Sequence, residues 1–133
     1  MGATSKPTPA LGDLEVAVLE ITWETPECSA KEVHERIGRQ RGISLNTVQS
    51  TLERLHRKEL LTRSKRGHAY RYTASVERER LIASYIRETL GRFGGDAVSS
   101  LAAFVDAAED IDESSLERLE EELRKRRQGR RGQ

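Results

Sequence analysis

The chain has 133 residues, of which 35% are hydrophobic, 34% are charged and 5% are aromatic. Typical proteins carry about 45–50% apolar residues, so this chain suits thin amphipathic helices completed by a second copy rather than one thick core. The low aromatic content disfavours a stacking platform for single-stranded nucleic acid. No run approaches the ~18 apolar residues of a membrane span, and the given sequence does not open with the n-region and h-region pattern of a signal peptide. We therefore expect a cytoplasmic protein with one domain, or with one small domain and a helical appendage.

Cysteine and histidine usage excludes several kinds of site. Cys28 is the only cysteine, which excludes an internal disulfide and an all-cysteine metal site. The histidines, His34, His56 and His68, show no ligand spacing. No carboxylate pair, Cys/His arrangement or phosphate-binding loop occurs at a usable spacing. We therefore expect no enzyme activity, metal or cofactor, and we interpret Cys28 as a small apolar residue rather than a redox switch.

The net charge of +1 conceals three strongly charged segments. Residues 54–71 contain seven basic residues and one acid, residues 94–123 contain ten acids and one base, and residues 124–133 contain six bases. A concentrated basic segment in a nearly neutral chain predicts a surface that binds a polyanion. The acidic segment is interpreted as a solvated helix face. For residues 124–133, two interpretations stay open: a solvated disordered tail, or a segment that adds non-specific affinity for DNA.

The N-terminal part predicts an arm and a helix. Residues 1–10 are small and polar and contain two prolines, so we expect a flexible arm there. A first helix is expected over residues 11–24, because Leu14, Val18 and Ile21 recur at the spacing of one helix face.

Two further helices are expected, each with its own cap. Ser29 and Glu32 form a capping box at the start of the second helix, and Gly42 marks its end. Ser44 caps the third helix. The stripe that this third helix is expected to bury consists of Val48, Leu52 and Leu55.

A hairpin is predicted after the third helix. Residues 60–73 form two short segments on either side of Gly67, and the second segment is rich in residues that favour β-strands. Three helices followed by a basic-tipped hairpin are the element order of a winged helix-turn-helix. We therefore predict a mainly α protein with a small β-hairpin, in which a winged helix-turn-helix is followed by a C-terminal helical dimerisation region.

From Val76 onward the pattern is helical, with a break at Gly94-Gly95 and caps at Asp96 and Asp112. These helices are too thin and too charged to fold alone, so we interpret them as a dimerisation region. The apolar residues expected at the homodimer interface are Ile82, Tyr85, Ile86, Leu90, Phe93, Leu101, Val105, Leu116, Leu119 and Leu123. The predicted organisation is a flexible arm (1–10), a winged-helix DNA-binding domain (11–74), a helical dimerisation region (75–124) and a basic disordered tail (125–133).

The third helix has the size and the side chains of a DNA-reading helix. A helix of about 14 residues is roughly 20 Å long and fits the major groove of B-DNA. Asn46 and Ser50 lie opposite its buried stripe and Thr47 flanks it, and all three carry short hydrogen-bonding side chains that suit base edges. The residues expected to contact the DNA backbone are Ser44, Arg54, Arg57, Lys65, Arg66, His68 and Arg71. The alternative is an ordinary polar helix face on a winged helix that serves only as a protein-interaction module.

Several stretches carry a family resemblance: LGDLE at 11–15, ITW at 21–23, VHE at 33–35, NTVQSTLERL at 46–55, LL at 60–61 and YRY at 70–72. Together they resemble the BlaI/MecI penicillinase-repressor family of transcription regulators over residues 11–123. The resemblance implies a dimeric winged-helix repressor on a palindromic, inverted-repeat operator of double-stranded DNA. It places the third helix in the major groove and the C-terminal helices at the dimer interface.

The resemblance also suggests a release mechanism. In β-lactam-responsive members, a membrane sensor-protease triggers cleavage of the repressor in its fifth helix, often between Asn and Phe. The matching residues here are Ala103 and Phe104, so the Asn is absent. Copper-responsive relatives carry paired C-x-C motifs near the C-terminus, and this chain has none.

Overall fold

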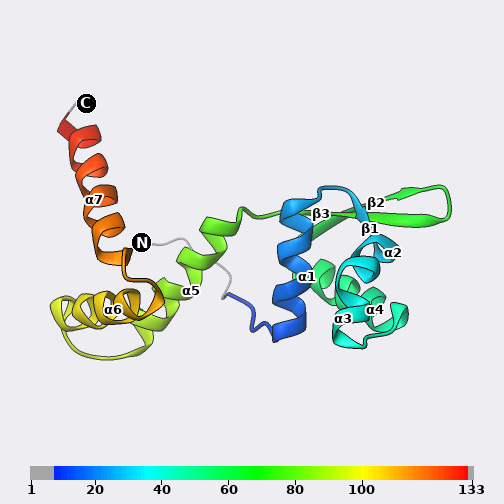
Figure 1. Ribbon diagram of the computed structural model, residues 1–133, viewed down its shortest axis with the longest axis horizontal. Coiled ribbons are helices and arrows are strands. Elements are labelled where there is room, and N and C mark those ends of the chain that lie inside the picture. Colours follow the sequence, from blue (N-terminus) through cyan, green and yellow to red (C-terminus); the bar gives the residue numbers. More distant parts are fainter. Residues whose placement is uncertain (1–7, 132–133) are drawn as a thin grey trace. The chain divides into compact units, whose positions relative to one another are not determined.

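The computed structural model describes residues 8–131, and the chain divides into two compact units that meet between Glu88 and Thr89 (Figure 1). Residues 1–7 of the predicted arm and residues 132–133 of the predicted tail lie outside the described residues. The helical elements of the first unit are α1 (Asp13–Glu24), α2 (Ala30–Val33), a π-helical turn (His34–Gly38), α3 (Arg39–Arg41) and α4 (Leu45–Arg57). The strands are β1 (Cys28–Ser29), β2 (Leu61–Arg66) and β3 (Ala69–Ala74). The remaining helices are α5 (Arg78–Arg92), α6 (Ala97–Ile111) and α7 (Ser115–Arg131).

The predicted caps at Ser29 and Ser44 are confirmed, but Asp112 does not cap the last helix: it follows the end of α6, and α7 begins only at Ser115. The Ser29 hydroxyl accepts the Glu32 amide at 3.2 Å, and the Glu32 carboxylate accepts the Ser29 amide at 3.0 Å, which completes the capping box of α2. The Ser44 hydroxyl accepts the Thr47 amide at 3.1 Å at the start of α4. Both helices of the helix-turn-helix therefore begin where local side-chain hydrogen bonds satisfy their first amides.

The predicted hairpin is part of a three-stranded antiparallel sheet with strand order β1-β3-β2. Leu61 pairs with Ala74 at the base of the β2–β3 hairpin, and Arg66 pairs with Ala69 at its tip. Strand β1 has two residues and pairs Cys28 with Tyr72. The sequence did not indicate β1, because two residues are too few to show an alternating pattern. Figure 1 shows the hairpin reaching well beyond β1, as a wing does.

The core of the first unit confirms the predicted stripe of α4. Val48, Leu52 and Leu55 are 0% exposed and pack with residues of α1, the sheet and α5. The buried partners outside α4 include Val18, Leu19, Ile21, Cys28, Val33, Leu60, Leu61, Tyr72 and Leu81. Since the stripe faces the core, the opposite face of α4 is left in solvent.

The second unit has a different character. None of the described residues from 89 to 131 is buried, although α6 and α7 contact each other. Large apolar side chains are exposed, among them Phe93 (73%), Val98 (77%) and Ile111 (81%). Asp96 caps α6 as predicted, accepting the Ser99 amide at 2.6 Å. Among residues 8–131, no helix combines the length and the apolar run needed to span a membrane.

The C-terminus differs from the predicted disordered tail. Helix α7 continues to Arg131, so residues 125–131 are helical. Arg, Lys and Gln are good helix formers, and cations near the end of a helix interact favourably with its dipole. These local preferences outweigh the mutual repulsion of the basic side chains.

One ion pair joins the start of α1 to the end of α4. Lys58 Nζ donates to the carboxylate of the buried Glu15 at 2.6 Å and to the Ala10 carbonyl at 2.9 Å, and the Gly12 amide donates to Glu15 at 3.0 Å. Burial alone would raise the pKa of Glu15, but the hydrogen bonds from Lys58 and Gly12 and the charges of Lys58 and Arg54 outweigh it and lower the pKa.

This ion pair predicts a pH dependence of stability. Because the pKa of Glu15 is lower in the folded chain than its ordinary value of 4.5, the carboxylate stabilises the fold above that value. The contribution is lost as the pH falls through the lowered pKa. We expect Glu15→Gln to reduce the free energy of unfolding by about 1 kcal/mol at neutral pH and to have less effect in acid. Urea unfolding at several pH values measures this, with the exposed Glu35→Gln as a control; an equal effect at every pH would contradict it.

Candidate nucleic-acid interface

The exposed face of α4 presents the predicted base-reading residues. Asn46, Thr47 and Ser50 are exposed, and Asn46 and Ser50 lie one helical turn apart. The residues that line a shallow groove of about 480 Å³ along this face are Asn46, Gln49, Ser50, Glu53, Arg54 and Arg57. The structure therefore gathers polar side chains and two arginines on one side of a helix that is anchored by its other side.

A second groove of about 520 Å³ lies between α4, the start of α2 and β3. Its lining includes Leu45 and Tyr70, which are 37% and 40% exposed, together with Gln49, Lys31 and His68. Sequence reasoning missed these residues except His68. A helical wheel could have found Gln49, which follows Asn46 by three positions, whereas only the tertiary structure brings Tyr70 beside the start of α4.

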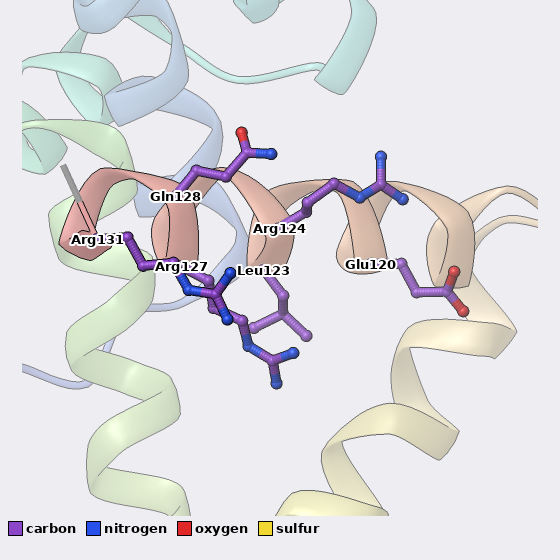
Figure 2. Close-up of a pocket in the computed structure, with 6 residues that line it drawn as sticks. All are labelled: Glu120, Leu123, Arg124, Arg127, Gln128 and Arg131. Carbon is purple, nitrogen blue, oxygen red and sulfur yellow. The ribbon is translucent and has the colours of Figure 1, made fainter.

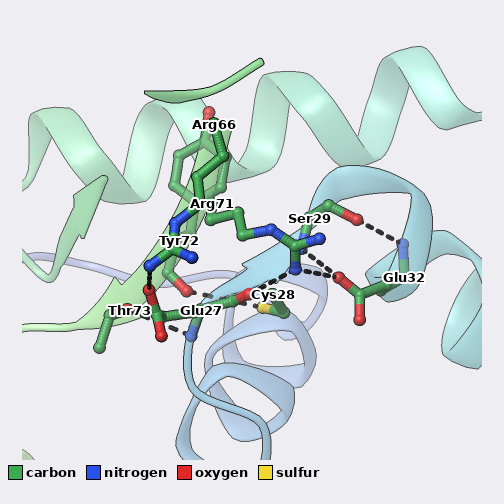
Figure 3. A network of polar contacts seen from close by, with 8 residues as sticks. All are labelled: Glu27, Cys28, Ser29, Glu32, Arg66, Arg71, Tyr72 and Thr73. Atoms are coloured by element: carbon green, nitrogen blue, oxygen red, sulfur yellow. Dashed lines mark hydrogen bonds and ion pairs between the residues drawn. The ribbon is translucent and has the colours of Figure 1, made fainter. Parts of the chain in front are cut away.

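Two cations of the predicted DNA-contacting set are paired with oxygen atoms of the protein itself, at its surface (Figure 3). Arg71 donates to the Glu27 carbonyl and to the Glu32 carboxylate, both at 2.9 Å. Arg66 donates to the Glu27 carboxylate at 2.6 Å. The Ser29 amide and hydroxyl, followed by Arg71, lower the pKa of Glu32. Arg71 thus connects β3 to the capping box of α2, and the wing carries less unpaired positive charge than its sequence suggests.

A third acid connects the wing to α4. Glu53 accepts from the Arg63 guanidinium and from the Tyr72 hydroxyl, the latter at 3.2 Å. The Arg63 guanidinium also lies over the Tyr70 ring, 4.2 Å from its centroid. A carboxylate on this face would repel phosphate, so the pairing with Arg63 both neutralises Glu53 and holds β2 against α4.

Several cations stay available. Among the described residues, no ion-pair partner is found for Arg54, Arg57, Lys65 or His68. Three of them, Arg57, Lys65 and His68, also make no side-chain hydrogen bond there. Arg54 donates to the Thr51 hydroxyl at 3.2 Å. Arg57 lies in the last turn of α4 and Lys65 near the wing tip, while Ser44 is exposed at the N-terminus of α4. Unpaired arginines therefore lie at the C-terminal end of the polar face, and further unpaired basic side chains lie on the wing.

The turn before α4 fixes the angle at which this helix leaves α3. The Ile43 amide donates to the Gly38 carbonyl at 2.8 Å, and the Gly42 amide donates to Arg39 at 3.4 Å with Gly42 at φ 65°, a helix stop that favours glycine. The His34 ring bonds to the Ile43 carbonyl at 2.9 Å. A β-carbon at Gly38 would overlap this ring, 2.8 Å from its Cγ and closer to other ring atoms.

We expect Gly38→Ala to destabilise the first unit by about 1–3 kcal/mol, because the added methyl group displaces the His34 ring from Ile43. Gly91→Ala is the matched control, since Gly91 lies in a helix with nothing within 4 Å of an added β-carbon. That control should leave the free energy of unfolding of the first unit unchanged, because Gly91 belongs to the second unit. Chemical denaturation compares the two, and similar stabilities would show that the ring moves aside without cost.

The residues predicted at a dimer interface fall into three groups. Tyr85 packs against the core of the first unit and donates to the Pro9 carbonyl, so it already has a structural partner there. Ile82, Phe93, Leu101 and Leu123 are exposed. The half-buried members are Ile86, Leu90, Val105, Leu116 and Leu119. The predicted cleavage residues, an exposed Ala103 and a half-buried Phe104, lie inside α6.

These elements define a winged helix-turn-helix, a class of DNA-binding domain, as the sequence predicted. Residues 11–125 match the family described as penicillinase repressor, and the chain belongs to this family of transcriptional repressors. The chain is 31% identical over 114 residues to the transcriptional regulator BlaI of Mycobacterium tuberculosis, covering 85% of this chain and 82% of that protein. It is 24% identical over 106 residues to the penicillinase repressor of Staphylococcus aureus, covering 80% and 84%. The solution structure of the DNA-binding domain of the repressor BlaI superposes with a TM-score of 0.50 at 27% identity, covering 56% of this chain and 90% of that one.

Proposed function

We propose that this protein is a dimeric, sequence-specific repressor that reads an inverted-repeat operator with α4. The observation that carries the proposal is the exposed face of α4, where Asn46 and Ser50 lie one turn apart opposite a stripe with no solvent exposure. That arrangement lets a helix enter the major groove with its polar side chains toward the bases while the domain core holds it rigidly.

The structure supports a division of roles among the polar residues. Asn46 is suited to bidentate pairing with adenine, Ser50 and Gln49 to other base edges, and the Thr47 methyl to a thymine methyl. The residues proposed to contact phosphate are Ser44, Arg54, Arg57, Lys65 and His68. Arg66 can offer phosphate only the N–H groups that its bond to Glu27 leaves free, and Arg71 acts by positioning the wing.

Base-reading and phosphate-contacting residues make different predictions. Asn46→Ala should cost about 1–3 kcal/mol at particular base pairs and relax the preference there. Arg57→Gln should weaken binding to all sequences and reduce the salt slope by about 0.9. Fluorescence anisotropy on the operator, found by footprinting, and on single-base variants of it distinguishes the two. A uniform loss for Asn46→Ala would contradict base readout.

A homodimer is proposed because the second unit lacks a core of its own. Because none of the described residues from 89 to 131 is buried, these helices need another apolar surface to pack against. A second copy of the chain supplies such a surface, since it exposes the same apolar side chains. Two copies related by a twofold axis would present two α4 helices to successive major grooves.

Leu90→Asp should therefore yield monomers in sedimentation velocity, because it places a charge on the apolar side of α5. Loss of the second half-site contact should weaken operator binding by about 100-fold or more. Thr89→Asp introduces the same charge at the neighbouring exposed position and should leave the dimer intact. A Leu90→Asp protein that stays dimeric and binds normally would refute the proposed interface.

Release from DNA is proposed to act through the second unit, since loss of the dimer removes paired half-site binding. Cleavage between Ala103 and Phe104 by a membrane sensor-protease is one such signal. Both residues are helical, so a protease would first have to unfold part of α6.

A protein-interaction module is the second candidate function. The partly exposed Leu45 and Tyr70 beside one groove favour it, because apolar side chains at a groove suit a peptide. A DNA affinity that does not change with salt would support this alternative, whereas a steep dependence supports the repressor.

A further inference from the structure

The C-terminal half of α7 is a cationic helix that the repressor fold does not explain. Residues 124–131 contain six basic residues and no acid, and all of them are exposed. The match to the penicillinase-repressor family ends at residue 125, so most of this segment lies beyond it. The segment is helical through Arg131, which places its charges at fixed spacings.

Three of these arginines share one side of α7 (Figure 2). Arg124, Arg127 and Arg131 line a shallow pocket of about 400 Å³ together with Gln128, next to Leu123 and Glu120. Within the described residues, Arg124 pairs with Glu121 at 2.5 Å, and this is the only ion pair of the segment. The guanidinium groups of Arg127 and Arg131 are therefore available to an external anion.

Helix electrostatics accounts for only part of this charge. Cations stabilise the C-terminus of a helix, but the effect falls off within the last turn, about four residues. It can explain Arg130 and Arg131 but not the basic residues at 124–127. Stability alone thus gives no reason for the length of the basic run.

The chemistry of the segment favours duplex DNA over a membrane. No apolar side chain follows Leu123 in the described part of α7, so an amphipathic face for a lipid surface is missing. Six cations are spread over about 12 Å of helix, and DNA carries one charge per about 1.7 Å of its axis. Five of the six are arginines, whose planar guanidinium group binds phosphate oxygens in a bidentate manner.

We propose that the C-terminal half of α7 is a second, sequence-independent contact for the phosphate backbone of duplex DNA, used in addition to the winged helix. This inference rests on the proposed function in one respect: the repressor function is the reason to expect DNA, rather than another polyanion, as the ligand. Once α4 and the wing hold the DNA, binding by α7 is intramolecular, so weak contacts contribute strongly to retention.

The test uses the full chain with two charge-matched triple variants. The α7 variant is Arg127→Gln/Arg130→Gln/Arg131→Gln, and the control is Arg80→Gln/Arg87→Gln/Arg92→Gln on α5. The probe is a random-sequence duplex of about 40 base pairs, long enough for two separate contacts. Anisotropy titrations give the slope of log Kd against log salt, and circular dichroism checks that helix content is retained.

The α7 variant is expected to reduce the salt slope by about 2 to 3, and the control by less than about 1. Equal reductions in both variants would mean that net charge alone matters and would overturn the proposal. An unchanged slope in the α7 variant would overturn the proposal as well. Vesicles of phosphatidylserine test the alternative: if the wild type binds them and the α7 variant does not, while both proteins show the same DNA slope, the segment binds lipid and the proposal fails.

The result also separates this proposal from the repressor function. If the wild type binds no duplex at all, both proposals fail. If the wild type shows base preference that Asn46→Ala relaxes, but the α7 variant keeps the wild-type slope, only the α7 contact fails.

Discussion

Burial of one face of α4 is the constraint on which the rest of the structure depends. Val48, Leu52 and Leu55 are inaccessible to solvent, and burying such a side chain stabilises a fold by about 1.5–3 kcal/mol. Because helical side chains keep fixed angular positions, the same burial leaves Asn46 and Ser50 outside. The burial that stabilises the domain therefore also keeps the polar face of α4 turned toward solvent.

The acids of the first unit determine how its positive charge is used. Glu27, Glu32 and Glu53 each hold an arginine of the wing. Such surface pairs contribute little to stability, so their effect is chiefly geometric: they orient the hairpin relative to α2 and α4. The cations without such partners are then the ones that can exchange water and counterions for phosphate.

The two units solve the shortage of apolar residues in different ways. The first unit concentrates its large apolar side chains into one core around α4, whereas the second has no buried residue among those described. Helices without a core need tertiary contacts to persist, since isolated helices are marginal in water. A low apolar content in the whole chain thus becomes a local deficit in α6 and α7, and this deficit is the physical reason to expect a partner surface.

Local signals in the sequence determined the order of the helices, the caps at Ser29, Ser44 and Asp96, and the buried stripe of α4, because each depends on residues within about four positions. The resemblance to the penicillinase-repressor family also came from short stretches of the sequence alone. Only the tertiary structure decided which cations are unpaired, since Arg71 and Glu32 are 39 residues apart. It also decided the strand β1 and the groove beside Tyr70, because non-local contacts depend on how complete elements pack rather than on any periodic pattern.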